Sequence, residues 1–220
     1  MIRALIFDFD GLIMDTESPE VEAWQVIYAE YGQEFPLQVW VRDVVGATAI
    51  NFDPAAHLAS ITGRTFDLSS LHARAHTYRL IKLGTLSALP GVLDYIKDAK
   101  RFGLRLAVAS SSKHDWVDGY LSQLGLFDDF EVIVCRDEVQ RVKPAPDLFL
   151  AALKALHISA KEVLVFEDSP NGILAAKRAG IRVVAVPNPI TAQGTIDGAD
   201  LFLSSMTDKP LEEVLGHFQL

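Results

Sequence analysis

Short, nearly continuous apolar stretches occur along the chain at residues 4–9, 104–110, 130–135, 163–167 and 183–187. They are rich in Val, Ile, Leu and Phe and do not alternate with polar residues, which is typical of strands buried on both faces of a sheet. Between them, residues 91–102, 113–124, 147–156 and 170–179 have the pattern of helices, and three of these segments end just before a Gly. This alternation predicts an α/β fold with a parallel sheet and helices on both faces.

The first strand breaks this rhythm, because no second strand follows until residue 104. Residues 19–31, 39–46, 53–62 and 68–83 read as helices instead. The simplest arrangement is a helical insert between the first two strands, with hinges near residues 15–18 and 84–90. We therefore predict a core domain from residues 1–15 and 88–220, and a helical cap domain from residues 16–87.

Composition and charge narrow the class of protein. Half of the 220 residues are hydrophobic and 22% are charged, which suits a globular chain with a sizeable core. The net charge of −9 argues against nucleic-acid binding, which needs a clustered basic surface. It also means that a phosphate substrate would be repelled unless a cation lies in the site.

Several further features concern the cellular compartment. Cys135 is the only cysteine, so no internal disulfide is expected, and its apolar neighbours suggest that it is buried. The N-terminal apolar run soon meets Asp8, which argues against a secretory signal. No apolar stretch approaches the ~18 residues of a membrane span. We expect a cytoplasmic protein without membrane partners, and a monomer as the default.

Asp8 and Asp10 come at the end of the first predicted strand. Residues i and i+2 of a strand point to the same side, and open α/β sheets bind ligands at the carboxyl ends of their strands. Gly11 lets the backbone turn away sharply. On its own, this Asp-x-Asp pattern is equally well explained as a solvated turn.

The other strand ends also carry polar side chains. Ser110, Ser111 and Ser112 end the second strand, and backbone N–H groups before a helix form a natural phosphate cradle. Ser112 and Asp115 also fit a capping box, and Ser169 before Pro170 fits a helix N-cap. The remaining residues of this kind are Lys143, which precedes Pro144, and the pair Glu167 and Asp168 at the end of the fourth strand.

Together these residues form a coherent set. Asp8, Asp10, Glu167 and Asp168 would make an oxygen-rich pocket suited to Mg²⁺, while Ser110 and Lys143 supply donors for a phosphoryl group. A bound Mg²⁺ would offset the mutual repulsion of the carboxylates and their repulsion of the substrate.

The motif set resembles the haloacid dehalogenase (HAD) superfamily over essentially the whole chain. Residues 8–17 look like its first motif, Ser110 its second, Lys143 its third, and Glu167 with Asp168 its fourth. Residues 166–180 are similar to the branch that contains β-phosphoglucomutase and sugar phosphatases. This resemblance implies a Rossmann-like core with an inserted helical cap.

The resemblance also implies roles. Asp8 would attack phosphorus and form an aspartyl-phosphate, and Asp10 would protonate the leaving oxygen and then deprotonate water. Mg²⁺ would be held by Asp8, Asp168 and the backbone carbonyl of Asp10, with Glu167 as a further ligand or just behind the ligands. Ser110 and Lys143 would stabilise the transferring phosphoryl group. The substrate would contact Gly11, Thr16, Glu17, Ser111 and Ser112.

Within the family, Asp10, Glu20 and Ala49 favour phosphatase activity. Asp10 favours phosphate esters, because dehalogenases lack an acid there and phosphonatases have a small residue. Thr16 matches β-phosphoglucomutase, but Glu20 replaces a His of the mutase and Ala49 replaces its phosphate-binding Arg. We therefore expect a Mg²⁺-dependent phosphatase of small phosphorylated metabolites, in particular sugar phosphates.

Two alternatives stay open: phosphoryl transfer of the phosphoglucomutase type, and an inactive family member that acts as a binding protein. In the cap, solvated helix faces are the simpler explanation for the polar residues that could contact substrate, which are His57, Arg64, His72, Arg74, His76 and Arg79. Trp24 and Trp40 are expected in the core of the cap.

Overall fold

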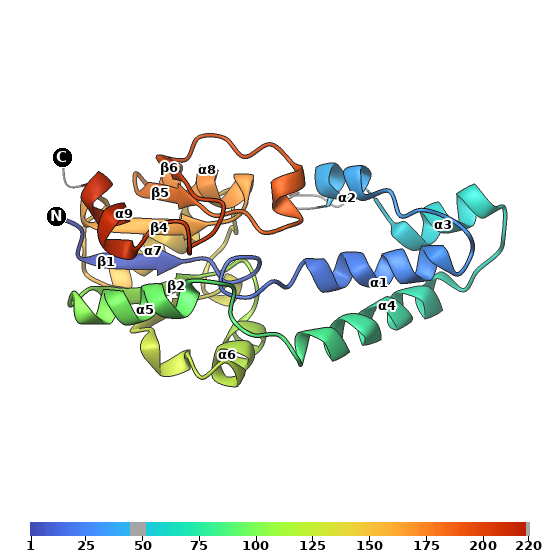
Figure 1. Cartoon of the computed structure of the whole chain (residues 1–220), viewed down its shortest axis with the longest axis horizontal. Helices are drawn as coiled ribbons and strands as arrows, with labels where there is room; N and C mark the ends of the chain where they lie inside the picture. The colour runs from blue at the N-terminus through green and yellow to red at the C-terminus, as the bar shows by residue number, and fades with distance from the viewer. Residues whose placement is uncertain (45–51, 219–220) are drawn as a thin grey trace.

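The computed structural model describes residues 1–44 and 52–218, in which one parallel sheet forms the centre of the larger domain (Figure 1). The sheet has the order β3-β2-β1-β4-β5-β6. Its strands are β1 (Ala4–Phe7), β2 (Arg105–Ala109), β3 (Val132–Val134), β4 (Val163–Glu167), β5 (Arg182–Ala185) and β6 (Leu201–Phe202). The α/β class and the five expected strands are confirmed, whereas the two-residue β6 was missed because it is too short to leave a pattern.

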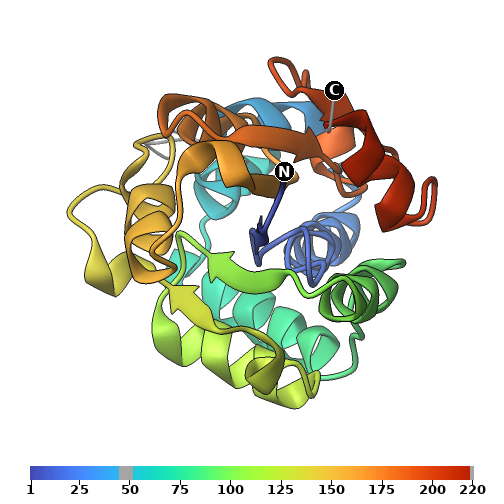
Figure 2. The ribbon, with the colours of Figure 1, turned by 90° about the vertical axis from the view of Figure 1, so that its left-hand side faces the viewer.

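Helices cover both faces of this sheet, as Figure 2 shows in the view along it. The helices of the core domain are α5 (Val92–Arg101), α6 (His114–Gln123), α7 (Asp147–Ala155), α8 (Pro170–Arg178) and α9 (Leu211–His217). Side chains from α5, α6 and α9 pack with Leu5 and Phe7 of β1, whereas those from α7 and α8 pack with Ala4 and Ile6. Successive strand residues thus point into two separate apolar layers, as buried parallel strands require.

Short 3₁₀ helices connect some of these elements. They are η1 (Phe127–Asp129), η2 (Arg136–Glu138), η3 (Ala160–Glu162) and η4 (Thr191–Gln193). The expected burial of Cys135, just before η2, is confirmed.

The helical domain projects from the end of the core at which β1 terminates (Figure 1). Its helices are α1 (Ser18–Ala29), α2 (Leu37–Asp43), α3 (Pro54–Thr62) and α4 (Leu68–Leu83). The apolar core of this domain includes Trp24 and Trp40, as expected. Asp53 and Asp67 begin α3 and α4, and their carboxylates accept backbone N–H groups of the first turn.

Within the described residues, each helix that the sequence predicts therefore occurs, with shifted ends, and α9 was not predicted. Ala49 belongs to residues 45–51, which lie outside the described residues. The exact domain bounds at residues 15–16 and 87–88 stay a prediction.

Candidate active site

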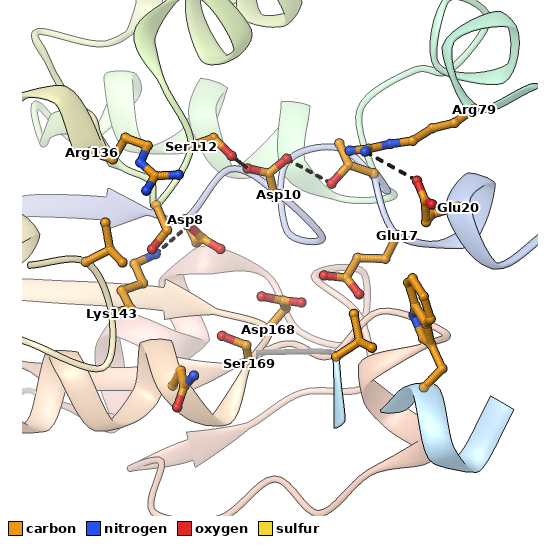
Figure 3. Close-up of a pocket in the computed structure, with 16 residues that line it drawn as sticks. Asp8, Asp10, Glu17, Glu20, Arg79, Ser112, Arg136, Lys143, Asp168 and Ser169 are labelled. Atoms are coloured by element: carbon orange, nitrogen blue, oxygen red, sulfur yellow. Dashed lines mark hydrogen bonds and ion pairs between the residues drawn. The ribbon is translucent and has the colours of Figure 1, made fainter. Parts of the chain in front are cut away.

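A cavity of about 740 Å³ lies where the carboxyl ends of the strands face the cap (Figure 3). Asp8 reaches it because it directly follows β1, and its backbone N–H donates to the carbonyl of Phe166 in β4 at 3.0 Å. Since β1 and β4 are paired neighbours, Glu167 and Asp168 come next to Asp8. The expected convergence of these carboxylates is confirmed.

Lys143 joins two of the carboxylates. Its Nζ lies 2.5 Å from Asp8 Oδ1 and 2.6 Å from Glu167 Oε1, and all three side chains are buried. Burial lowers the pKa of Lys143, but Asp8 and Glu167 outweigh it and hold this pKa above its usual value. Lys143 is therefore a fixed positive charge beside Asp8.

Burial has the opposite effect on the acids. It raises the pKa of Asp8 to about 8, with a further contribution from the charge of Glu167, while Lys143 acts to lower it. The pKa of Asp168 is also raised well above its usual value, first by burial and then by Glu167 and Asp8. One lysine does not compensate three carboxylates, so the site favours an additional cation.

The geometry fits such a cation. One oxygen each from Asp8, Glu167 and Asp168 lie within 4.8 Å of one another. Glu167 Oε1 is buried, and among the described residues it accepts no hydrogen bond of regular geometry despite the nearby lysine. Buried carboxylate oxygens are ligands that Mg²⁺ prefers. The carboxylate of Asp10 is not part of this cluster, and the role of its backbone carbonyl stays a prediction.

Two glycines make room for the cluster. Gly11 has φ +78°, and a Cβ there would lie 2.5 Å from Asp168 Oδ2. A Cβ on Gly172, in the first turn of α8, would lie 1.9 Å from the carboxylate of Glu167. Gly11 was expected to contact substrate, but it is not among the residues that line the cavity. Its role in the structure is to let the backbone turn beneath Asp168.

Asn188 is a site residue that the sequence analysis missed. Its side-chain amide donates to Asp168 Oδ2 at 2.8 Å and to the Gly11 carbonyl at 3.4 Å. Its own Oδ1 accepts the backbone N–H groups of Ile190 and Thr191, so the amide is held in one orientation. Asn188 follows β5, so the strand-end argument could have found it.

Asp10 accepts hydrogen bonds on both of its carboxylate oxygens. Thr16 Oγ1 at 2.9 Å and Trp116 Nε1 at 2.8 Å donate to Oδ1. Ser112 Oγ at 2.6 Å and Ser110 Oγ at 3.3 Å donate to Oδ2. The structure thus brings Thr16, Ser110 and Ser112 together around Asp10, as residues of one site, and adds Trp116, which the sequence did not suggest.

Of the two helix caps that the sequence predicts, the structure contradicts the one at Ser112 and confirms the one at Ser169. Ser112 does not form a capping box with Asp115, because α6 begins at His114 and the Ser112 hydroxyl donates to Asp10 instead. Ser111 lines the cavity. Ser169 does cap α8, since its Oγ accepts the N–H of Gly172 at 3.2 Å.

Cap residues close the other side of the cavity (Figure 3). Glu17 and Glu20 come from the start of α1, and Arg79 from α4 forms an ion pair with Glu20 at 3.3 Å. Burial raises the pKa of Glu17 to about 7, with contributions from the charges of Asp10 and Asp15. Arg136 of η2 also lines the cavity and was missed.

Of the six polar cap residues considered from the sequence, Arg79 alone is among the residues that line this cavity. Three of the others contact partners inside the cap: His57 meets Tyr28, His72 meets Asp53 and Arg74 meets Glu30. For Arg79, the interpretation as a solvated helix face was therefore wrong.

Both the core and the cavity-forming cap agree with the family to which the sequence points. The chain matches the haloacid dehalogenase-like hydrolases over residues 5–186, and it belongs to this family. The resemblance noted from the motifs is thus confirmed, as is the class of enzyme, a hydrolase.

Individual relatives cover almost the whole chain. The Bacillus subtilis (strain 168) protein named "Putative phosphatase YhcW" is 46% identical over 217 residues, which are 99% of this chain and 98% of that protein. The structure is similar to CbbY from Rhodobacter sphaeroides in complex with phosphate (TM-score 0.69, 27% identity, 94% and 96% of the two chains). It is also similar to a "putative beta-phosphoglucomutase" from Thermotoga maritima (TM-score 0.75, 28% identity, 98% and 99%).

Within residues 1–44 and 52–218, no helix is long and apolar enough to cross a membrane. The expected compartment, the absence of nucleic-acid partners and the monomeric state stay predictions.

Proposed function

We propose that the protein is a Mg²⁺-dependent phosphatase that hydrolyses small phosphorylated metabolites, sugar phosphates in particular. The observation that carries this proposal is the buried contact of Asp8 with Lys143 beside the three-carboxylate cluster. The phosphatase name of the B. subtilis relative and the phosphate bound to CbbY support it.

Each residue of the site has a role in this reaction. Asp8 attacks phosphorus, the bond to the leaving oxygen breaks, and Asp10 gives that oxygen a proton. Asp10 then takes a proton from the water that hydrolyses the aspartyl-phosphate. Lys143 and Ser110 stabilise the transferring phosphoryl group. When bound by Asp8, Asp168 and Glu167, Mg²⁺ supplies the positive charge that the site requires.

A phosphoglucomutase activity is the second candidate, and the similarity to the T. maritima protein favours it. Against it, Glu20 accepts the indole N–H of Trp24 at 3.0 Å and pairs with Arg79. It is therefore a carboxylate engaged inside the cap, at the position of a mutase histidine. Assays with glucose 1-phosphate should release phosphate, whereas efficient formation of glucose 6-phosphate would favour the mutase.

The central experiment measures phosphate release from p-nitrophenyl phosphate and from a panel of sugar and polyol phosphates. We expect turnover with Mg²⁺, none with EDTA, and a loss of roughly 10³-fold or more in Asp8→Asn. Asp94→Asn, an exposed change in α5, is the matched control and should stay active.

Two outcomes would contradict the proposal. An active Asp8→Asn variant would remove Asp8 as the nucleophile. A wild-type protein without Mg²⁺-dependent turnover of any ester would favour the binding-protein alternative.

A further inference from the structure

Trp116 stands between the cap and Asp10. It belongs to α6 of the core, and its Nε1 donates to Asp10 Oδ1 at 2.8 Å. The guanidinium of Arg79, from α4 of the cap, lies over its ring at 4.8 Å from the centroid. Tyr120, one turn further along α6, packs its ring against the same indole at 4.8 Å. Trp116 is not among the residues that line the cavity, but it contacts two that do, Asp10 and Arg79.

The donors around Asp10 are not chemically equivalent. The hydroxyls of Thr16, Ser110 and Ser112 can donate or accept, so they tolerate a proton on either oxygen of Asp10. The indole N–H of Trp116 can only donate. The oxygen that it meets, Oδ1, must therefore remain an acceptor whether Asp10 is protonated or not. Thr16 and Trp116 together use the acceptor positions of Oδ1, whereas both partners of Oδ2, Ser110 and Ser112, are hydroxyls that can accept instead. This arrangement favours the proton of the acid form on Oδ2.

Arg79 contacts the indole of Trp116 from the side of the cap. Its guanidinium is fixed by the ring of Trp116 and by Glu20 at 3.3 Å. Its Nε is buried without a hydrogen-bond partner in the described part of the chain. A cation over an indole attracts the ring, so this contact seats Trp116 when the cap lies over the core. Figure 3 shows Arg79 reaching from the cap toward the side of Asp10 opposite Ser112.

We infer that Trp116 is a positioning residue that keeps the transferable proton of Asp10 on Oδ2, and that Arg79 supports it from the cap. This inference rests on the proposed function, because it concerns the proton that Asp10 gives to the leaving oxygen. A structural role alone would be to fill space between α6 and the cap.

The test compares two esters whose leaving groups differ in basicity. Nitrophenolate leaves with little help from an acid, whereas the alkoxide of glycerol phosphate requires a proton. Trp116→Phe keeps the ring and loses the N–H. We expect its kcat/KM for glycerol phosphate to fall about tenfold and that for p-nitrophenyl phosphate to fall less than about twofold.

Tyr120→Phe is the matched control, since it changes an aromatic neighbour on the same helix and leaves the hydrogen bonds of Asp10 intact. Its ratio of the two kcat/KM values should equal that of the wild type. An equal loss on both esters in Trp116→Phe, or no loss on either, overturns the inference and leaves the proposed function standing. A wild-type enzyme inactive with Mg²⁺ on every ester of the panel overturns the proposed function, and the inference with it.

The link to the cap has its own measurement. Arg79→Met should lower the ratio of kcat/KM for glycerol phosphate to kcat/KM for p-nitrophenyl phosphate. In the Trp116→Phe background it should lower this ratio little further, because the effects of coupled residues are not additive. Additive losses would overturn the role of Arg79. Thermal unfolding of each variant verifies folding, and if Trp116→Phe does not fold, the ester ratio in Arg79→Met decides alone.

Discussion

At the scale of single residues, the acids of the cavity are arranged for chemistry at a cost in stability. Asp8, Asp168 and Glu17 all have pKa values raised first of all by burial. A raised pKa of a carboxyl group means that its charged form is less stable in the folded chain than in the unfolded one. In the proposed function, Asp8 and Asp168 need that charge to bind a cation. Glu17 is not part of this carboxylate cluster, so its effect on stability can be measured without a metal.

We predict that Glu17→Gln stabilises the protein at pH 8 and hardly at pH 5. The pKa of Glu17 is raised from 4.5 to about 7. The stabilisation that its proton gives the folded state is fully present below the unfolded value of 4.5. It is lost as the pH rises through about 7. The variant, which never ionises, should therefore gain about 1–2 kcal/mol at pH 8, allowing for partial solvent screening.

Urea unfolding at the two pH values, in EDTA, measures this difference. Glu22→Gln, on the surface of the same helix, is the control and should show no such gain at pH 8. Equal effects of Glu17→Gln at pH 5 and pH 8 would mean that burial does not perturb this carboxyl.

The residues that the sequence predicted and those that it missed differ in how they reach the site. Asp8 directly follows β1 and Glu167 ends the paired strand β4, so strand adjacency brings these two together, whereas Lys143 reaches them through the loop after β3. Trp116 reaches Asp10 from the first turn of a helix, over 106 positions in sequence. Its orientation depends on how α6 packs, which no local pattern encodes.

At the scale of elements, the parallel sheet was predictable because each buried strand is a continuous apolar run. β6 and α9 were not predicted, and the two residues of β6 are too few to leave a pattern. Of the two predicted helix caps, one was right and one was wrong. Ser169 caps α8 as its sequence suggests, whereas Ser112 gives its hydroxyl to Asp10. The Ser112 hydroxyl donates to the charged carboxylate of Asp10 and does not cap α6.

Two helical glycines should respond in opposite directions to the same change. Gly172→Ala places a methyl group 1.9 Å from the Glu167 carboxylate, so we expect a loss of about 1–3 kcal/mol and of most activity. Gly119→Ala, inside α6, meets nothing within 4 Å and should gain about 0.5–1 kcal/mol. Urea unfolding measures both. A neutral Gly172→Ala would show that Glu167 can move away freely.

At the scale of the whole molecule, charge connects the sequence to the site. The chain carries a net charge of −9, and its cavity gathers acids from both domains. The net negative charge of the chain repels a phosphate at long range, and the acids of the cavity repel it at short range. The sequence alone indicated that a cation must resolve this conflict. The structure adds where the carboxylates that could hold such a cation converge, because Asp8 and Asp168 directly follow two paired strands.

If the cluster binds Mg²⁺, the metal should stabilise the folded chain even when no substrate is present. A ligand at 100 times its Kd adds about 2.7 kcal/mol, which for a chain of this size raises the thermal unfolding midpoint by about 5–10 °C. MgCl₂ should raise this midpoint relative to NaCl of equal ionic strength.

Asp168→Asn should lose this rise, yet unfold at a higher temperature than the wild type in EDTA, because one of three repelling carboxylates is gone. Asp94→Asn should behave like the wild type in both conditions. A variant that keeps the full Mg²⁺ effect would place the cation elsewhere, whereas one destabilised in EDTA would mean that Asp168 holds the fold through Asn188 rather than straining it.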